Sequence, residues 1–132
     1  MNALTTEWIE KAEGDFATAG RELRARRYPN YDAACFHAQQ VAEKYLKAFP
    51  QEHDRTFPKT HNLVELLELC LVVDPEFEAQ RNRLIVLDRH AVRYRYPGDA
   101  ADKEEARDAY RTTRTLRVLF RAKLGLGDQE GI

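Results

Sequence analysis

Arg83 and His90 are the two residues whose types and spacing best suit phosphate chemistry. Seven steps at about 100° each return to nearly the same face of a helix. An imidazole titrates near neutral pH and can move a proton, and an arginine can stabilise the charge that develops on a phosphate. Together they could cleave RNA without a metal, the histidine acting on the ribose 2′-hydroxyl.

Distance within one helix opposes this pairing, because seven residues separate the two α-carbons by about 10 Å along the axis. A break in the helix near His90, or a partner related by two-fold symmetry, would be needed to bring the groups together. The alternative interpretation is a boundary histidine that is stabilised by the dipole at a helix end.

Basic residues gather in two parts of the chain. The first cluster, with Asp88 as the acid inside it, could face phosphate groups or could be a solvated surface, and its candidate binding residues are Arg81, Arg83, Arg89, Arg93, Arg95 and Tyr96. The second follows one side of the last predicted helix and consists of Lys103, Arg107, Arg111, Arg114, Arg117 and Arg121. Arginine forks suit phosphate oxygens. The alternative for the second cluster is a solvated helix face, acidic at its start and basic at its end as the helix dipole prefers.

Other chemistry has little support in the sequence. His53, Asp54 and His61 are the candidates for a metal site, and no Cys or His pair has the spacing of structural zinc. The chain contains no serine and no glycine-rich phosphate loop. We therefore expect neither a metal nor a cofactor.

Apolar residues recur at steps of three and four, which predicts helices throughout and an all-α, up-and-down bundle of four to five helices. We expect a first helix from about Thr6 to Arg26, capped by Thr5 or Thr6, and a second from Asn30 to Phe49 that ends at Pro50. The remaining helices are expected over residues 61–72, 75–93 and 101–124. Residues 1–125 are expected to form a single domain, followed by a disordered tail over 126–132.

Composition agrees with one globular domain. The chain has 132 residues, of which 43% are hydrophobic and 33% charged, and its formal net charge is −1. A polyanion site must therefore come from local clustering of cations. No apolar stretch is long enough to span a membrane, and the first residues do not resemble a signal peptide, so we expect a cytoplasmic protein with reduced cysteines.

Four short motifs resemble the HEPN family, the higher eukaryotes and prokaryotes nucleotide-binding domain. The most specific lies over residues 33–48, AACFHAQQVAEKYLKA, which is similar to the family pattern A-x-x-F-x-x-Q-Q-A-x-E-K-x-L-K-A. The other three are the opening WIEKAEGDF over residues 8–16, THNL over 60–63, and RYP over 95–97, which matches one branch of the family. The similarity spans residues 7–121.

The resemblance implies a two-fold homodimer with a link to nucleotides or RNA, and no association with a membrane. Many bacterial members act beside a minimal nucleotidyltransferase as a toxin–antitoxin or regulatory pair. Active ribonuclease members carry R-x(4–6)-H, which Arg83 and His90 meet at the upper limit of spacing. We therefore expect a nucleotide- or RNA-binding module that works with a nucleotidyltransferase. The alternatives are a metal-independent endoribonuclease toxin that uses Arg83 and His90, and a non-catalytic interaction subunit.

Overall fold

The computed structural model describes residues 1–93 and 96–127, without the side chains of 91–93. The expected all-α bundle is confirmed, with five α-helices and no strand among the described residues. The elements are α1 (Ala3–Arg24), α2 (Tyr31–Glu52), α3 (Leu63–Val73), the 3-10 segment η1 (Pro75–Gln80), α4 (Arg81–Arg93) and α5 (Lys103–Lys123). No helix in these residues is both long and apolar enough to cross a membrane.

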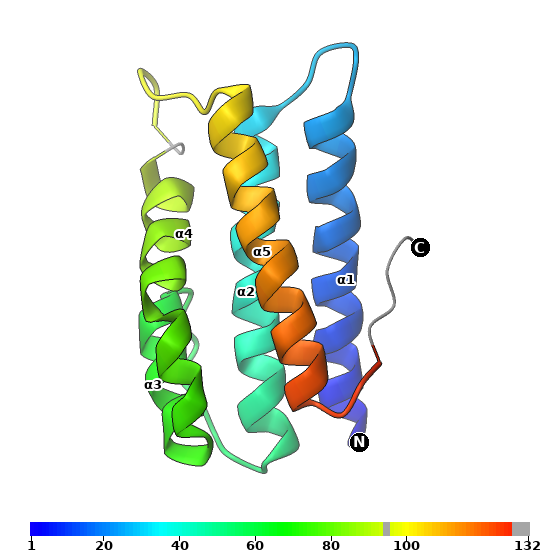
Figure 1. Ribbon diagram of the computed structural model, residues 1–132, viewed down its shortest axis with the longest axis vertical. Helices are drawn as coiled ribbons and strands as arrows, with labels where there is room; N and C mark the ends of the chain where they lie inside the picture. The colour runs from blue at the N-terminus through cyan, green and yellow to red at the C-terminus, as the bar shows by residue number, and fades with distance from the viewer. Residues whose placement is uncertain (94–95, 128–132) are drawn as a thin grey trace.

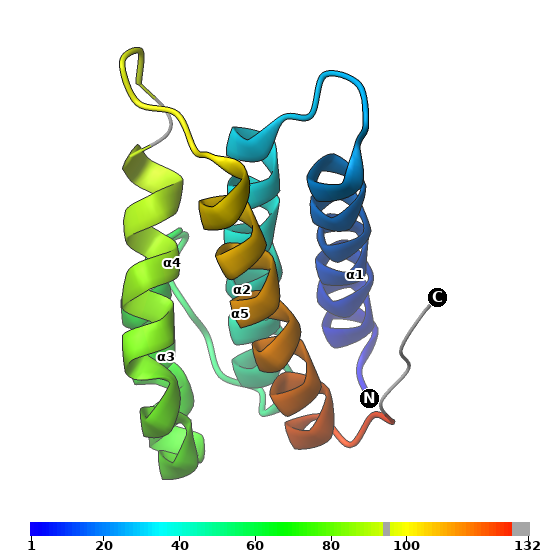
Figure 2. The same ribbon diagram turned by 45° about the horizontal axis from the view of Figure 1, so that its top comes forward.

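Helices α1, α2, α4 and α5 run alternately up and down (Figures 1 and 2). In Figure 1, α1 rises from the N-terminus, α2 descends, α4 rises and α5 descends, while the short α3 lies beside the lower part of α4. The α1–α2 turn and the α4–α5 connection therefore meet at one end of the bundle, which we call the turn end. Helix α2 contacts each of the other four α-helices, so it is the centre of the packing.

An aromatic cluster fills the core towards the opposite end. Tyr45 stacks on Phe120 with 5.7 Å between ring centroids, and Phe77 lies 4.7 Å from Phe49 and 5.6 Å from Phe120. These four side chains are almost completely buried and come from α2, η1 and α5. Large rings contribute strongly to hydrophobic stabilisation. This cluster therefore holds η1, which precedes α4, and α5, which follows it, against α2.

Two of the expected helix starts are wrong. Asn2, not Thr5 or Thr6, caps α1, because its side-chain oxygen accepts the Thr5 backbone N–H at 2.8 Å and starts the helix at Ala3. The segment after Asp74 begins as the 3-10 turn η1 and becomes an α-helix only at Arg81. Asp74 caps η1, as expected from the Asp-Pro pair.

The sequence predicts that the second helix ends at Pro50, but helix α2 continues past this proline to Glu52. A proline inside a helix leaves the carbonyl four residues earlier without its usual N–H donor. Here that carbonyl belongs to Leu46, and the Cys70 thiol of α3 donates to it at 3.4 Å. Packing of α3 against α2 therefore supplies the partner that proline removes, which local sequence rules cannot anticipate.

Candidate phosphate-binding site

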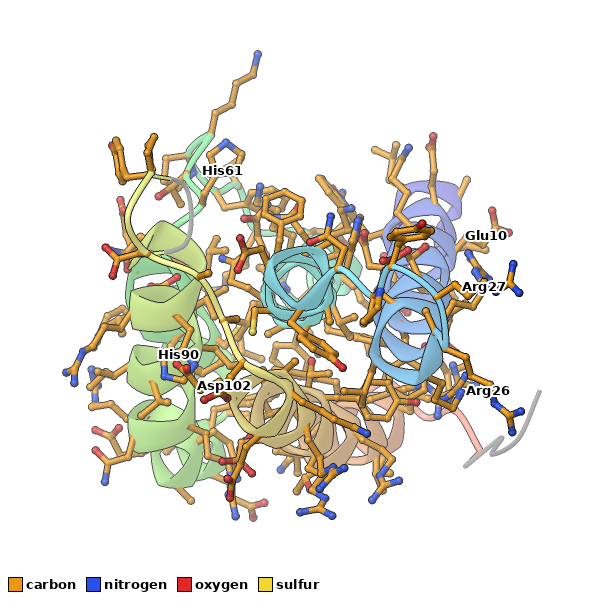
Figure 3. The ribbon with its side chains drawn as sticks, turned by 90° about the horizontal axis from the view of Figure 1, so that it is seen from above. Glu10, Arg26, Arg27, His61, His90 and Asp102 are labelled. Carbon is orange, nitrogen blue, oxygen red and sulfur yellow. The ribbon has the colours of Figure 1, made fainter. Side chains whose placement is uncertain are left out.

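The structure places Arg83 and His90 on one uninterrupted helix, α4. Their seven-residue spacing keeps them on one face but about 10 Å apart along the axis, so a single chain does not bring them together on one phosphate. Arg83 is exposed and His90 is half-buried. Val86 lies on the same side of the helix and is 46% exposed. Figure 3 shows His90 on α4 and Asp102 at the beginning of α5.

Arg81, a predicted phosphate ligand, is already paired with acids. Its Nε lies 2.7 Å from Glu78 and one of its terminal nitrogens 2.6 Å from Glu68 of α3. The hydrogen bonds that the Arg81 guanidinium donates to Glu78 and then to Glu68 raise its pKa. The Arg81 side chain therefore braces α4 against α3 and offers little free charge to a ligand.

Two arginines of α4 keep their charge available. Arg83 donates a 2.8 Å hydrogen bond to the neutral Gln80, and Arg89 is exposed. Neither forms an ion pair with any carboxylate in the described part of the chain. The side chain of Arg93, and Arg95 as a whole, lie outside the described residues. Tyr96, beyond them, is 65% exposed at the turn end.

Asp88, the acid inside the α4 cluster, points into the bundle. It accepts the Leu63 backbone N–H at 2.8 Å and the Gln39 side-chain amide at 3.3 Å. Burial raises the pKa of this carboxyl above its ordinary value, although the hydrogen bonds oppose the shift. Asp88 thus satisfies a backbone donor at the start of α3 and does not neutralise the outward-facing arginines.

The basic row of α5 is divided by the fold. Arg117 and Arg121 are buried and face Glu13 of α1. The Arg117 guanidinium donates to the two Glu13 oxygens at 2.7 and 2.5 Å, and the Tyr45 hydroxyl donates to one of them at 2.6 Å. Burial alone would raise the pKa of Glu13, but the hydrogen bonds from Arg117 and Tyr45 outweigh it and lower that pKa. The prediction of one solvated row is therefore wrong for its last two members. The exposed members are Lys103, Arg107, Arg111 and Arg114.

A second group of buried polar residues, centred on Glu43 of α2, joins α2 to the loop before α3. Glu43 is 3% exposed, and its carboxylate lies 3.2 Å from the Lys47 ammonium and 3.1 Å from His61 Nδ1. The Lys47 ammonium also sits over the Trp8 ring, 5.3 Å from its centroid. Lys47 is only 6% exposed, so its charge is buried with that of Glu43.

Asp15 of α1 joins the same helix from the other side. His37 Nδ1 lies 2.8 Å from one Asp15 oxygen, and Lys44 forms an ion pair with the other. Within the Q-Q-x-x-E-K stretch, Gln39 therefore contacts Asp88 of α4, and Lys44 contacts Asp15 of α1. Sequence reasoning treated them as a family signature and missed this role, although polar residues at core-facing helical positions are a signal that could have revealed it.

Of the predicted metal candidates, His61 contacts a carboxylate, and that carboxylate belongs to Glu43. His53 and Asp54 are exposed in the loop after α2. In the described residues, no group of three or more histidine, cysteine or acidic side chains is arranged to hold a metal ion.

Comparison with known proteins identifies the class of this fold. The family model of the HEPN domain matches residues 5–122, so the chain belongs to the HEPN family. The crystal structure of TT1696 from Thermus thermophilus superposes with a TM-score of 0.70 and 23% sequence identity, covering 90% of this chain and 97% of that one. That likeness shows a shared fold. No curated protein matches the sequence significantly. Membership of the R-Y-P branch stays a prediction.

Proposed function

We propose that this HEPN domain is a nucleotide- or RNA-binding module that binds phosphate groups on the outer side of α4. The observation that carries the proposal is the pair Arg83 and Arg89. Both are exposed, and neither is neutralised by a carboxylate of the described residues, whereas the neighbouring Arg81 is held by two. Free guanidinium groups on a protein of net charge −1 mark a local anion site.

We further propose that the module is a cytoplasmic homodimer that acts with a nucleotidyltransferase-domain protein in a toxin–antitoxin-like or regulatory system. Membership of the HEPN family supports the proposal of a nucleotidyltransferase-domain partner. The dimer is supported by Val86, an exposed apolar residue on the Arg83 face, since a second copy would cover such a side chain.

Binding of labelled single-stranded RNA, followed by fluorescence anisotropy over a salt series, tests the proposal. Replacing Arg83 and Arg89 together with alanine should weaken binding and lower the slope of log affinity against log salt by about 1.4, because two phosphate contacts are lost. Arg81→Ala is the control to compare with each single replacement, Arg83→Ala and Arg89→Ala, since it removes one charge from the same helix at a position already paired. An affinity that is equal for wild type and the double variant would refute the proposal and leave the interaction-subunit alternative.

A metal-independent endoribonuclease is the second candidate, and the shared face of Arg83 and His90 favours it. Two copies facing each other could combine the arginine of one with the histidine of its partner on one phosphate. His90→Ala should then lower cleavage of RNA in excess chelator by roughly 10²–10⁴-fold, and a 2′-deoxy sugar at the cut should abolish it. Cleavage that persists in His90→Ala, or that requires magnesium, would exclude this mechanism.

A further inference from the structure

A depression at the turn end lies between the end of α1 and the start of α5, away from the α4 arginines. It has a volume of about 570 Å³ and is lined by four cationic side chains and by Tyr31. The cations are Arg24 and Arg26 from the α1 side, and Lys103 and Arg107 from α5. No acidic residue belongs to its lining. We call it the α1–α5 pocket. Figure 3 looks down on this end and shows Arg26 extending away from the bundle on the α1 side.

The four cations of the α1–α5 pocket are not neutralised by the protein. None of them forms an ion pair or a side-chain hydrogen bond with any residue that the structure describes. The backbone leaves room for one of them, because Gly20 lies beneath the Arg24 guanidinium, whose terminal nitrogens would be 3.0 Å from a Cβ at that position. Like charges that converge without counter-charges repel each other, so an anion in the pocket would be stabilised.

Helix dipoles account for only part of this arrangement. Arg24 is in the last turn of α1, where a cation is favourable. Lys103 and Arg107 are in the first two turns of α5, where a cation is unfavourable. Two carboxylates of that region are engaged in the capping box of α5, formed by Asp102 and Glu105. The dipole of α5 therefore does not explain the placement of Lys103 and Arg107.

An aromatic residue, Tyr28, adjoins residues of the pocket lining along the chain. Tyr28 follows the cationic Arg26 by two residues and precedes Pro29, which also lines the pocket. Its ring is 96% exposed, and its φ of +50° is a conformation that costs a non-glycine residue roughly 1 kcal/mol or more. Burial does not compensate for this strain. Proteins bind single-stranded nucleic acids by combining a basic groove with exposed aromatic rings on which the bases stack.

We propose that the α1–α5 pocket is a second phosphate-binding site, which takes the phosphate of a nucleotide or of an RNA strand while Tyr28 stacks on the adjacent base. This inference rests on the proposed function and gives it a second location, on the other side of α5 from the α4 arginines. The shared ligand chemistry is a phosphate joined to a nucleoside, and the two sources are a free nucleotide and an RNA chain.

Binding of two probes tests the site: a fluorescent ATP analogue and a labelled ten-nucleotide oligo(A). Replacing Arg26 and Arg107 together with alanine should weaken binding of the probe that uses the pocket by about tenfold or more, because each lost contact is a hydrogen bond to a charged group. The matched control replaces Arg111 and Arg114, which are exposed cations of the same helix outside the pocket lining. Its net charge is identical, so its affinity should change much less.

Substitutions of Tyr28 distinguish binding of a nucleoside ligand from binding of a bare anion. Tyr28→Ala should weaken binding about fivefold or more, the usual value of one stacked base, while Tyr28→Phe should retain it. Inorganic tripolyphosphate should compete with the probe equally well in wild type and in Tyr28→Ala. If Tyr28→Ala binds the probe as tightly as Tyr28→Phe, the stacking role is refuted.

The same measurements distinguish the two proposals. Loss of binding in the Arg83 and Arg89 variant alone overturns the α1–α5 pocket and leaves the proposed function standing. Loss in the Arg26 and Arg107 variant alone supports the pocket and overturns the α4 site. An equal loss in the Arg111 and Arg114 control shows only general attraction to positive charge and overturns the pocket. Failure of the wild type to bind either probe overturns both.

Discussion

The buried ion pair of Glu43 and Lys47 gives the sharpest prediction about stability. Glu43→Gln keeps the shape of the side chain but removes its charge. The Lys47 ammonium then remains buried in contact with an amide oxygen and the Trp8 ring, without a carboxylate. Breaking a buried pair costs about 3–5 kcal/mol, and we expect about 3 because the amide can still accept a hydrogen bond. Lys47→Met should cost about 2 kcal/mol, since His61 and Gln40 still contact the carboxylate.

The double variant should reveal the coupling. With both charges removed, no buried ion remains alone, so we expect a loss of about 2 kcal/mol instead of the sum of about 5. Urea unfolding measures each free energy, and a slope of about 1–3 kcal/mol per molar makes a 3 kcal/mol change a shift of one molar or more in the midpoint. For a chain of this size the melting temperature of Glu43→Gln should fall by roughly 10 °C.

An exposed pair with the same chemistry and spacing provides the control. Glu7 and Lys11 lie four residues apart on α1, are both exposed and form no ion pair within the described residues. Glu7→Gln and Lys11→Met should each change the free energy of unfolding by no more than about 0.5 kcal/mol. Strictly additive losses at Glu43 and Lys47, or a Glu43→Gln protein as stable as wild type, would refute the reasoning.

Three further predictions concern single residues. Gly14→Ala, inside α1, should raise the free energy of unfolding in urea by roughly 0.5–1 kcal/mol, because a Cβ at this position meets nothing within 4 Å. Gly98→Ala should lower the free energy of unfolding, because Gly98 has a φ of +97°. Burial raises the pKa of the Cys35 and Cys70 thiols to about 12, so alkylation of the native protein at pH 8 should be no faster than unfolding, and rapid labelling would contradict this. The pKa of Glu13 is lowered in the folded protein, so the stabilisation by its charge is complete above the ordinary pKa of 4.5 and is lost as the pH falls below that value. The difference in unfolding free energy between wild type and Glu13→Gln should therefore shrink between pH 6 and pH 3.

Helical periodicity predicted the fold class and the order of the helices because each helix of this bundle buries one stripe of its surface. The misplaced boundaries depend on contacts from distant parts of the chain. Helix α2 passes Pro50 because Cys70 of α3 donates to the orphaned Leu46 carbonyl. Periodicity describes one helix at a time and carries no information about such partners.

The sequence could predict that Arg81, Arg83 and Arg89 share one helix, but not which of them are paired with acids. The sequence presents Arg81 and Arg83 as equivalent, and only the structure shows that Arg81 is neutralised by Glu68 and Glu78. Likewise, the α5 row seemed uniform until Arg117 was found paired with Glu13, which is 104 residues away in the chain. Arg26 was not among the predicted binding residues, because it joins Arg107 only through the packing of α1 beside α5.

The central position of α2 governs how the molecule opens. Because all four other α-helices pack on α2, any one of them can detach while the remaining contacts persist, whereas α2 cannot be exposed without dissolving the whole bundle. In native-state hydrogen exchange, the amides of α2 should therefore report the global unfolding free energy, and those of peripheral helices should exchange through partial openings of lower energy. The stretch over residues 33–48 that resembles the family pattern lies on this helix, which we expect to exchange most slowly. We then expect family members to share the residues that stabilise the whole bundle through α2. The cations on the outer surface would be free to differ between members that bind different ligands.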